Sequence, residues 1–254
     1  MSNIGIVRSI TQVGTYEPFE LQVARGQITG HSTVNIYGAN ATVSTSYVPV
    51  WEGNTYTFPA AAASMNVVST INTGSDKTGT TILVQGLDAN YTAISETVTL
   101  NGTTAVATTK SFLRINSISV SAGQPTGVIT IKDSTNTTTY AQITAGLGRS
   151  QMSIYTVPAG YTFYLSRIDA YTSFNGSNGD YVVYRNYSTT SSNVSSATQQ
   201  APFTNTYHAQ RVMPRPFTEK TDIQLQAKTS ANTAFISIAA EGFLVANAIT
   251  GSIG

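Results

Sequence analysis

The residues whose spacing comes closest to that of a ligand site lie between Val84 and Thr104, in VQGLDANYTAISETVTLNGTT. Asp88 and Asn90 have the spacing that opens the calcium loop of an EF-hand. That loop also requires a glycine at its sixth position and a glutamate at its twelfth, and this chain has Ala93 and Thr99 there. Because Asp and Asn side chains bond to the backbone of their own turn, the sequence predicts a β-turn between two strands.

The histidines, His31 and His208, are the next candidates for metal ligands. A metal site needs several His, Cys or carboxylate ligands that converge. Neither histidine has an acidic residue two or four positions away, and the chain contains no cysteine. We therefore expect no metal site and place both histidines on the surface or at an interface.

The motifs of the common catalytic sites are missing from the sequence. There is no Gly-x-Ser-x-Gly elbow for a nucleophilic serine. NTGSDKTGTT (Asn72 to Thr81) contains glycine, lysine and threonine but not in the order of a phosphate-binding loop, and it is typical of a polar hairpin tip. Two carboxylates converging in space would suit glycoside hydrolysis, but no spacing marks such a pair. The sequence thus predicts no catalytic residue, no cofactor and no enzyme.

Glu96 is the one charge that the pattern places on an apolar face. By strand parity it shares that face with Ile94, Val98 and Leu100. A buried carboxylate needs a partner, and Arg114 on a nearby strand is the candidate for a buried ion pair. The alternative is that Glu96 lies at a bulge or a subunit interface and does no chemistry.

The composition limits the class of protein. Charged residues make up 10% of the 254 residues, against about 25% in an ordinary globular protein. The net charge of +1 gives no basic field for nucleic acid, and no stretch approaches the ~18 apolar residues of a membrane span. The first residues lack the charged and apolar segments of a signal peptide, so we expect a protein made in the cytoplasm and not secreted.

Period-two alternation dominates the chain and predicts an all-β fold of sandwich or jelly-roll type with little or no helix. In TDIQLQAKT, Ile223, Leu225 and Ala227 alternate with polar residues. Asn101-Gly102 predicts a hairpin turn that pairs the strand before it with the strand after it. Further strands are expected at Gly127–Asp133, Tyr161–Ile168 and Phe235–Val245, and the first clear strand at PFELQVARG, residues 18–26.

Two β-sandwich domains in tandem are predicted, with a boundary in AGLGRSQ near Gly148. Residues 1–15 would form an N-terminal arm, 16–148 the first domain and 149–254 the second. The low-complexity segment Thr189–Ala201 would be a long exposed loop or an extension of a sheet edge.

Four segments together resemble a known group of proteins. They are YEPFELQVARGQITGHS (16–32), the stretch from GLDANYTAISETV to FLRI (86–115), YTVPAGYTFYLSRI (155–168) and the stretch from RPFTEKTDIQLQ to EGFLV (215–245). In order and type they resemble virion-associated structural proteins of tailed bacteriophages of the marine and cyanobacterial type. The resemblance implies a structural protein of the particle, and it offers no catalytic residue to carry over.

The expected function is therefore that of a non-enzymatic virion protein that decorates or cements the capsid. Its partners would be other copies of itself, as a trimer or hexamer, and phage capsid or tail proteins, because low charge lets neighbours meet without ion desolvation. The candidate contacts at the rim of an interface are Arg8, Glu17, Glu20 and Arg25. The alternatives are a head–tail adaptor, tail or fibre-anchoring ring, and a module that binds host-surface glycans through tyrosines and Trp51.

Overall fold

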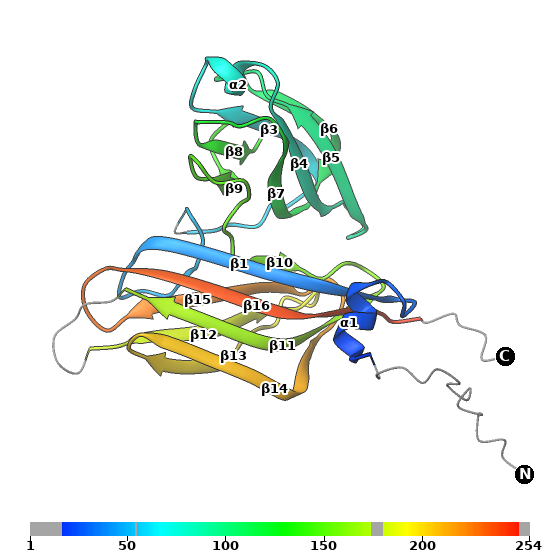
Figure 1. The fold of residues 1–254 in the computed structure, drawn as a ribbon, viewed down its shortest axis with the longest axis vertical. Helices are drawn as coiled ribbons and strands as arrows, with labels where there is room; N and C mark the ends of the chain where they lie inside the picture. The colour runs from blue at the N-terminus through cyan, green and yellow to red at the C-terminus, as the bar shows by residue number, and fades with distance from the viewer. Residues whose placement is uncertain (1–16, 54, 174–179, 249–254) are drawn as a thin grey trace, which may run out of the picture.

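The computed structural model describes residues 17–53, 55–173 and 180–248. These residues form antiparallel strands β1–β16 and the short helices α1 (Phe19–Ala24) and α2 (Gly74–Lys77), so the all-β prediction is confirmed. They fold into two β-units, one above the other in Figure 1.

The larger unit is a sandwich of two sheets, with the strand orders β1-β16-β11-β14 and β10-β15-β12-β13. Successive strands alternate between the two sheets along the chain, except that β12 and β13 form a hairpin within one sheet, and this is the connectivity of a jelly roll. We call this unit the jelly roll. Its core between the sheets includes the fully buried side chains of Phe163, Leu225 and Ile238. Its strands are β1 (His31–Val43), β2 (Val48–Pro49), β10 (Ile154–Thr156), β11 (Tyr161–Thr172), β12 (Val182–Thr189), β13 (Ser195–Phe203), β14 (Thr206–Phe217), β15 (Asp222–Thr229) and β16 (Ala234–Ala246).

The smaller unit, residues 51–152, is a second sandwich, which we call the insert. One sheet has the order β6-β3-β8-β9 and the other β5-β4-β7. Met65, Ile82, Phe112 and Ile131 are among the side chains buried between them. Its strands are β3 (Ala63–Ser69), β4 (Thr81–Leu87), β5 (Ala93–Thr99), β6 (Val106–Phe112), β7 (Arg114–Ala122), β8 (Ile129–Lys132) and β9 (Thr139–Ile143).

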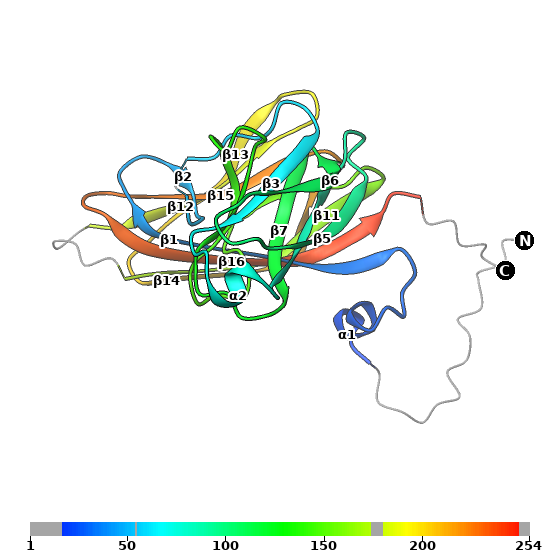
Figure 2. The same ribbon diagram turned by 90° about the horizontal axis from the view of Figure 1, so that it is seen from above.

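The insert interrupts a single edge strand of the jelly roll. β2 and β10 pair with consecutive parts of the same edge of β15, and residues 51–152 leave and return in the gap between them. Val50 and Ser153 face each other there, since Ser153 N donates to Val50 O at 3.0 Å. Gly38 of β1 is required at this point, because a Cβ on it would lie 1.9 Å from Val50 O. Figure 2 shows the insert lying over the jelly roll from above.

This arrangement differs from the predicted division into consecutive domains, 16–148 and 149–254. β1 pairs with β16 along most of its length, so residues 31–49 belong with the C-terminal half of the chain. The turn at AGLGRSQ marks the end of the insert, where the chain re-enters the jelly roll. The predicted arm, residues 1–15, lies outside the described residues.

Two local expectations also changed. The segment predicted as the first strand, residues 18–26, contains helix α1, which follows Pro18 and ends before Gly26, whose φ is +69°. Thr189 ends β12, residues 190–194 form a turn and residues 195–201 form most of β13, so the second alternative for this segment, a sheet edge, describes it.

The turn at Asp88 is confirmed. Asp88 Oδ1 accepts hydrogen bonds from Asn90 N at 2.8 Å and Thr92 N at 2.9 Å, and Tyr91 has a φ of +63°. Asn101 and Thr104 close a second tight turn. It is not the predicted hairpin, however, because β5 pairs with β4 and β6 pairs with β3, in opposite sheets.

Glu96 does not pair with Arg114, so the predicted ion pair is wrong. The Glu96 carboxylate accepts hydrogen bonds from the backbone N–H groups of Thr109 and Lys110, both at 2.8 Å. These N–H groups lie where the register between β3 and β6 shifts, so the ladder leaves them unpaired. The alternative interpretation of Glu96, a structural role at a bulge, is the one that the structure shows.

We predict that Glu96→Gln lowers the free energy of unfolding at pH 7 by about 1–3 kcal/mol, because one bulge N–H then loses its acceptor. Burial raises the pKa of Glu96, but the hydrogen bonds from Thr109 and Lys110 outweigh it and leave the pKa below 4.5. The stabilisation by the charge is therefore present above pH 4.5 and is lost as the pH falls through the lowered value.

Urea unfolding at several pH values measures this, and the two proteins should converge in acid. Glu20→Gln, on the exposed surface of α1, is the matched control. Equal effects of both substitutions would contradict a role for Glu96 at the bulge.

Candidate functional site

A network of buried polar groups lies at the contact between the insert and the jelly roll. Arg114, the first residue of β7, meets Asp222, the first residue of β15. Its Nε and Nη2 donate to the two carboxylate oxygens at 2.8 and 2.9 Å, and both residues are less than a tenth exposed. This is the two-bond geometry that fixes a guanidinium on a carboxylate most firmly.

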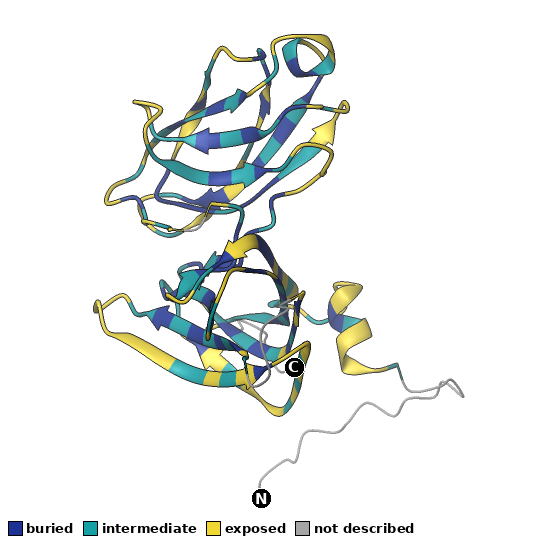
Figure 3. Cartoon of the chain, turned by 90° about the vertical axis from the view of Figure 1, so that its left-hand side faces the viewer, coloured by how far each residue is buried: buried dark blue, intermediate teal, exposed yellow. Residues whose placement is uncertain are grey.

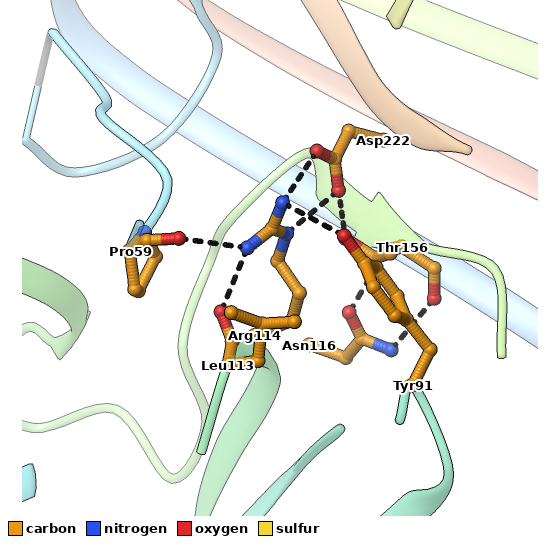
Figure 4. A network of polar contacts seen from close by, with 7 residues as sticks. All are labelled: Pro59, Tyr91, Leu113, Arg114, Asn116, Thr156 and Asp222. Atoms are coloured by element: carbon orange, nitrogen blue, oxygen red, sulfur yellow. Dashed lines mark hydrogen bonds and ion pairs between the residues drawn. The ribbon is translucent and has the colours of Figure 1, made fainter. Parts of the chain in front are cut away.

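The remaining groups of this pair are also bonded (Figure 4). Arg114 Nη1 donates to the carbonyl oxygens of Pro59 and Leu113, both at 2.9 Å. The hydroxyl of Thr156 donates to Asp222 Oδ1 at 2.6 Å. Because the partners of both charges are thus largely supplied by the protein, the site holds the two units together and leaves little bonding capacity for a substrate.

A second polar link lies beside the first. Asn116 of β7 donates to Thr156 O at 3.0 Å and accepts from Thr156 N at 2.9 Å, so its amide pairs with the backbone of β10 as a neighbouring strand would. Ala159 N also donates to Tyr91 O at 2.9 Å. The two units are therefore joined by directional bonds at several points.

Aromatic rings cover the ion pair. The Arg114 guanidinium lies 4.8 Å from the ring centre of Phe58 and 5.5 Å from that of Tyr91. Edge-to-face contacts continue from Phe58 through Tyr56 to Trp51. Trp51 is only 2% exposed, so it cannot be the glycan platform that the sequence suggested.

The charges in this site are stabilised by their partners. Burial alone would lower the pKa of Arg114, but its hydrogen bonds with Asp222 and the charge of that carboxylate raise it above the ordinary value. Burial raises the pKa of the Tyr56 hydroxyl well above 10, so this phenol stays neutral beside the pair. Both effects favour a fixed ion pair over a group that exchanges protons.

The outer face of the sheet β1-β16-β11-β14 carries a shallow groove of about 350 Å³. Tyr37, Ala239, Asp169 and His208 lie opposite one another in one row across the four strands. Tyr37 and Tyr171, 45% and 46% exposed, stand on either side of β16, whose residues in this groove are Ser237 and Ala239. We call this the tyrosine groove.

A larger hollow of about 620 Å³ lies on the same face, toward α1. Phe19 of α1 forms edge contacts with Phe243 and His31 at its border. Val212, on the opposite border, is 99% exposed, and its neighbour Met213 is 84% exposed. In Figure 3, α1 stands at the side of the jelly roll with most of its surface exposed.

The residues predicted for an interface do not form one cluster. Glu17 and Arg25 pair with each other across α1, Glu20 borders the hollow, and Arg8 lies outside the described residues. His31 and His208 lie apart on one face of the jelly roll, and His208 bonds to Asp169. Among the residues that the structure describes, no group of three or more His, Cys, Asp or Glu converges on a metal position.

Asp222 is the functional residue that the sequence did not reveal. Within TDIQLQAKT it stands at the start of a regular strand, and its partner Arg114 is 108 positions away. The only local signal was an acidic residue next to a strand of alternating pattern, which many exposed strand ends also show.

The comparisons with known proteins give little further information. No family model matches the chain, and no curated protein matches it. Among solved structures, a chain of the T13 particle of infectious bursal disease virus is 13% identical with a TM-score of 0.26, and the match covers 85% of this chain and 70% of that one. A chain of the Gt strain of the same virus is 13% identical with a TM-score of 0.23, covering 85% and 73%. At these TM-scores the likenesses support no argument about fold or function.

Neither of the helices in the described parts of the chain is long and apolar enough to cross a membrane.

We predict that Arg114→Met lowers the free energy of unfolding by about 3–5 kcal/mol, because it leaves the buried Asp222 carboxylate without a counter-charge. Calorimetry should then show the insert and the jelly roll melting separately. Asp222→Asn should have a similar effect, and the double variant should lose less than the sum of the two.

Arg167→Met is the matched control, because Arg167 pairs with Asp169 on the exposed face and such pairs contribute at most about 1 kcal/mol. Strictly additive losses at Arg114 and Asp222 would show that the pair does not couple the two units.

Proposed function

We propose that this chain is a non-enzymatic structural protein of a tailed-phage virion, and that it decorates or cements the capsid. The order of its sequence segments supports the virion assignment. The fold is compatible with it, because jelly rolls occur in viral capsid proteins as well as in lectins and cupins. Since fold does not determine function, the surfaces of the molecule have to carry the proposal.

The observation that carries it is a set of exposed apolar side chains on α1 and β14, the two elements that border the hollow. We call Phe19, Leu21, Val212 and Met213 the assembly patch; they are 41%, 48%, 99% and 84% exposed, and Phe19 and Val212 line the hollow itself. Val212 and Met213 are on a stretch of β14 that bulges away from β11. Apolar side chains that project this far are typical of a surface that another protein covers.

The charged residues predicted for the rim of an interface also have a place in this proposal. Glu17 and Arg25 neutralise each other beside it, and Glu20 lies at the border of the hollow. An apolar centre with charged residues around it is the usual anatomy of a protein interface. The partner in this proposal is a second copy of the chain, in a trimer or hexamer, which then sits on capsid proteins.

A head–tail adaptor, tail or fibre-anchoring ring in the same particle would use the same kind of surface. Copy number separates the two positions. Quantitative mass spectrometry of purified particles should give hundreds of copies for decoration, against about three to twelve for a ring, on symmetry grounds.

A second candidate function, binding of host-surface glycans, is favoured by the tyrosine groove alone. Tyr37 and Tyr171 offer exposed ring faces, and Asp169 and His208 offer polar atoms beside them. The two strands that carry the tyrosines are separated by β16, so they lie roughly 10 Å apart. A groove of this width suits one or two sugar rings.

We predict that Val212→Ser combined with Met213→Ser shifts the chain from oligomer to monomer in sedimentation analysis. Each buried side chain contributes about 1.5–3 kcal/mol to an interface that covers it. The free energy of unfolding should change by less than about 0.5 kcal/mol, because both side chains are exposed in the single chain.

Val194→Ser is the control, since Val194 is 62% exposed on the turn before β13. An unchanged oligomer in the double variant, or an equal shift in the control, would remove the assembly patch from the proposal.

For the glycan candidate, Tyr37→Ala combined with Tyr171→Ala should weaken binding to host polysaccharide about tenfold or more, equivalent to about 1.4 kcal/mol or more. Calorimetric titration measures it, with Tyr161→Ala combined with Tyr181→Ala as exposed tyrosines outside the groove. Equal binding by all three proteins would exclude the groove as the glycan site.

A further inference from the structure

One edge of the jelly roll is left open beside the insert. β1 is the last strand of its sheet, with β16 on one side, and it lies next to the insert in Figure 1. Part of its other side is occupied, because Tyr37 forms a bridge with Met152 and Ala39 N donates to Gln151 O at 3.4 Å. Before Tyr37, no strand of the described chain pairs with this edge.

The backbone of β1 directs unpaired groups to the open edge. In an antiparallel ladder the N–H and C=O of one residue point to the same side, and the side alternates along the strand. The register between β1 and β16 does not shift from His31 to Asn40. Because Ala39 points its N–H away from β16, Thr33 and Asn35 do so too. Among the described residues these two form no backbone hydrogen bond on that side, so the edge can accept a further strand.

A cleft of about 400 Å³ runs along this edge. One side of it is lined by the consecutive residues Thr33–Asn35 of β1, and the other by the ends of β4 and β5, Gln85–Leu87 and Ala93–Ser95. An added strand would lie roughly 4.8 Å from β1, and three residues of it would span about 10 Å. The insert therefore flanks the open edge without covering it.

The inner wall of the cleft is apolar. Val34, Tyr155 and Leu244 line it and pack against the core of the jelly roll. Across the cleft, Ile94 packs against the core of the insert. Because successive side chains of a strand point to opposite faces, an added strand would turn every second side chain toward this wall. Apolar residues at alternate positions would suit it.

One end of the cleft is positively charged. Arg149 is the only charged residue among the described residues that line it, and its exposed guanidinium forms no hydrogen bond or ion pair within them. It lies toward Tyr37, since both residues also line the small adjoining cavity. The side-chain oxygen of Gln85 accepts from Ser117 at 3.0 Å, which leaves the Gln85 amide nitrogen free to donate. These donors favour a ligand that brings a carboxylate.

We propose that this cleft binds an extended peptide segment of a partner protein, which adds a strand to β1 and places an acidic side chain beside Arg149. Backbone hydrogen bonds to Thr33 and Asn35 supply affinity, and the alternating pockets supply selectivity, as in other cases of strand addition. All pairs in this sheet are antiparallel, so the segment runs from the Tyr37 end toward Thr33. Its acidic residue therefore lies at its N-terminal end.

The bound segment would contact both units, because β1 belongs to the jelly roll and the facing ends of β4 and β5 belong to the insert. The proposal goes beyond the virion assignment and does not depend on it. Any partner with an exposed segment of this pattern would fit.

Titration of the full chain with the peptide acetyl-Asp-Thr-Val-Thr-Val-Thr-amide tests the proposal, with amide hydrogen exchange followed by nuclear magnetic resonance. We expect saturable binding and about tenfold slower exchange, or more, at the amides of Thr33 and Asn35, because both become paired. The same peptide with Asn in place of Asp should bind about tenfold more weakly, since it cannot form a charged hydrogen bond with Arg149.

Thr33→Pro separates backbone pairing from side-chain contact. It removes an N–H that is not part of the ladder with β16, and proline is tolerated there on an edge strand, so the fold should be kept. Binding should fall about tenfold or more, because one hydrogen bond is lost and the ring blocks the approach of the peptide. Thr33→Ala retains the N–H and should bind as the wild type does.

Arg149→Gln tests the charged end. This variant should bind the Asp and Asn peptides equally. Arg185→Gln is the matched control, because Arg185 stacks on Tyr47 and bonds to Gln226 away from the cleft. It should still distinguish the two peptides, and should Thr33→Pro fail to fold, this comparison decides.

No saturable binding to the wild type, or binding that leaves exchange at Thr33 and Asn35 unchanged, would overturn the proposal. Equal binding by a folded Thr33→Pro would also overturn it. If exchange at these amides slows as the concentration of the chain alone is raised, the edge pairs with a second copy, and the peptide proposal is wrong.

Discussion

The position of one β-unit on the other depends on the buried ion pair of Arg114 and Asp222. Each residue is the first of a strand, and the two strands belong to different sandwiches. Pro59 and Leu113 bond Arg114 within the insert, and Thr156 bonds Asp222 within the jelly roll, so each charge is fixed in its own unit. Sliding or tilting of the insert would break both Arg114–Asp222 hydrogen bonds at once. Separating the two residues would leave each charge buried without its partner, which costs free energy. We call this contact the joint, because that cost fixes the position of the insert.

The joint limits a movement that the chain path would otherwise allow to the insert. An insert attached through neighbouring residues of one strand is free to pivot about them, since Val50 and Ser153 are the only covalent connections. The polar links at Arg114 and Asn116 lie away from that point and remove this freedom. The result is a two-tier molecule in which the insert lies next to β1 and β10 of the jelly roll, and the β13–β14 edge lies on the side away from the insert.

Much of the local structure could be predicted from the sequence, and little of the long-range pairing could. Alternation in TDIQLQAKT gave β15, and the Asp88 turn followed from its own side-chain chemistry. Glu96 was placed on the correct face, but its acceptor role depends on a bulge in β6 that the pattern does not mark. The prediction of tandem domains was wrong for the same reason. The sequence of β1 predicts a strand, but nothing in it shows that β16 is its neighbour. The assembly patch was missed because Val212 and Met213 resemble core residues of a strand.

The most direct test of the joint is a distance measurement between the two units by electron spin resonance. The chain has no cysteine, so one spin label can be attached to the insert at Thr103→Cys and a second to the jelly roll at Thr204→Cys in the same chain. The account predicts one narrow distance distribution in this labelled chain and a broad one when Asp222→Asn is added. A broad distribution with Asp222 intact would contradict it, since the ion pair would then not hold the insert in place.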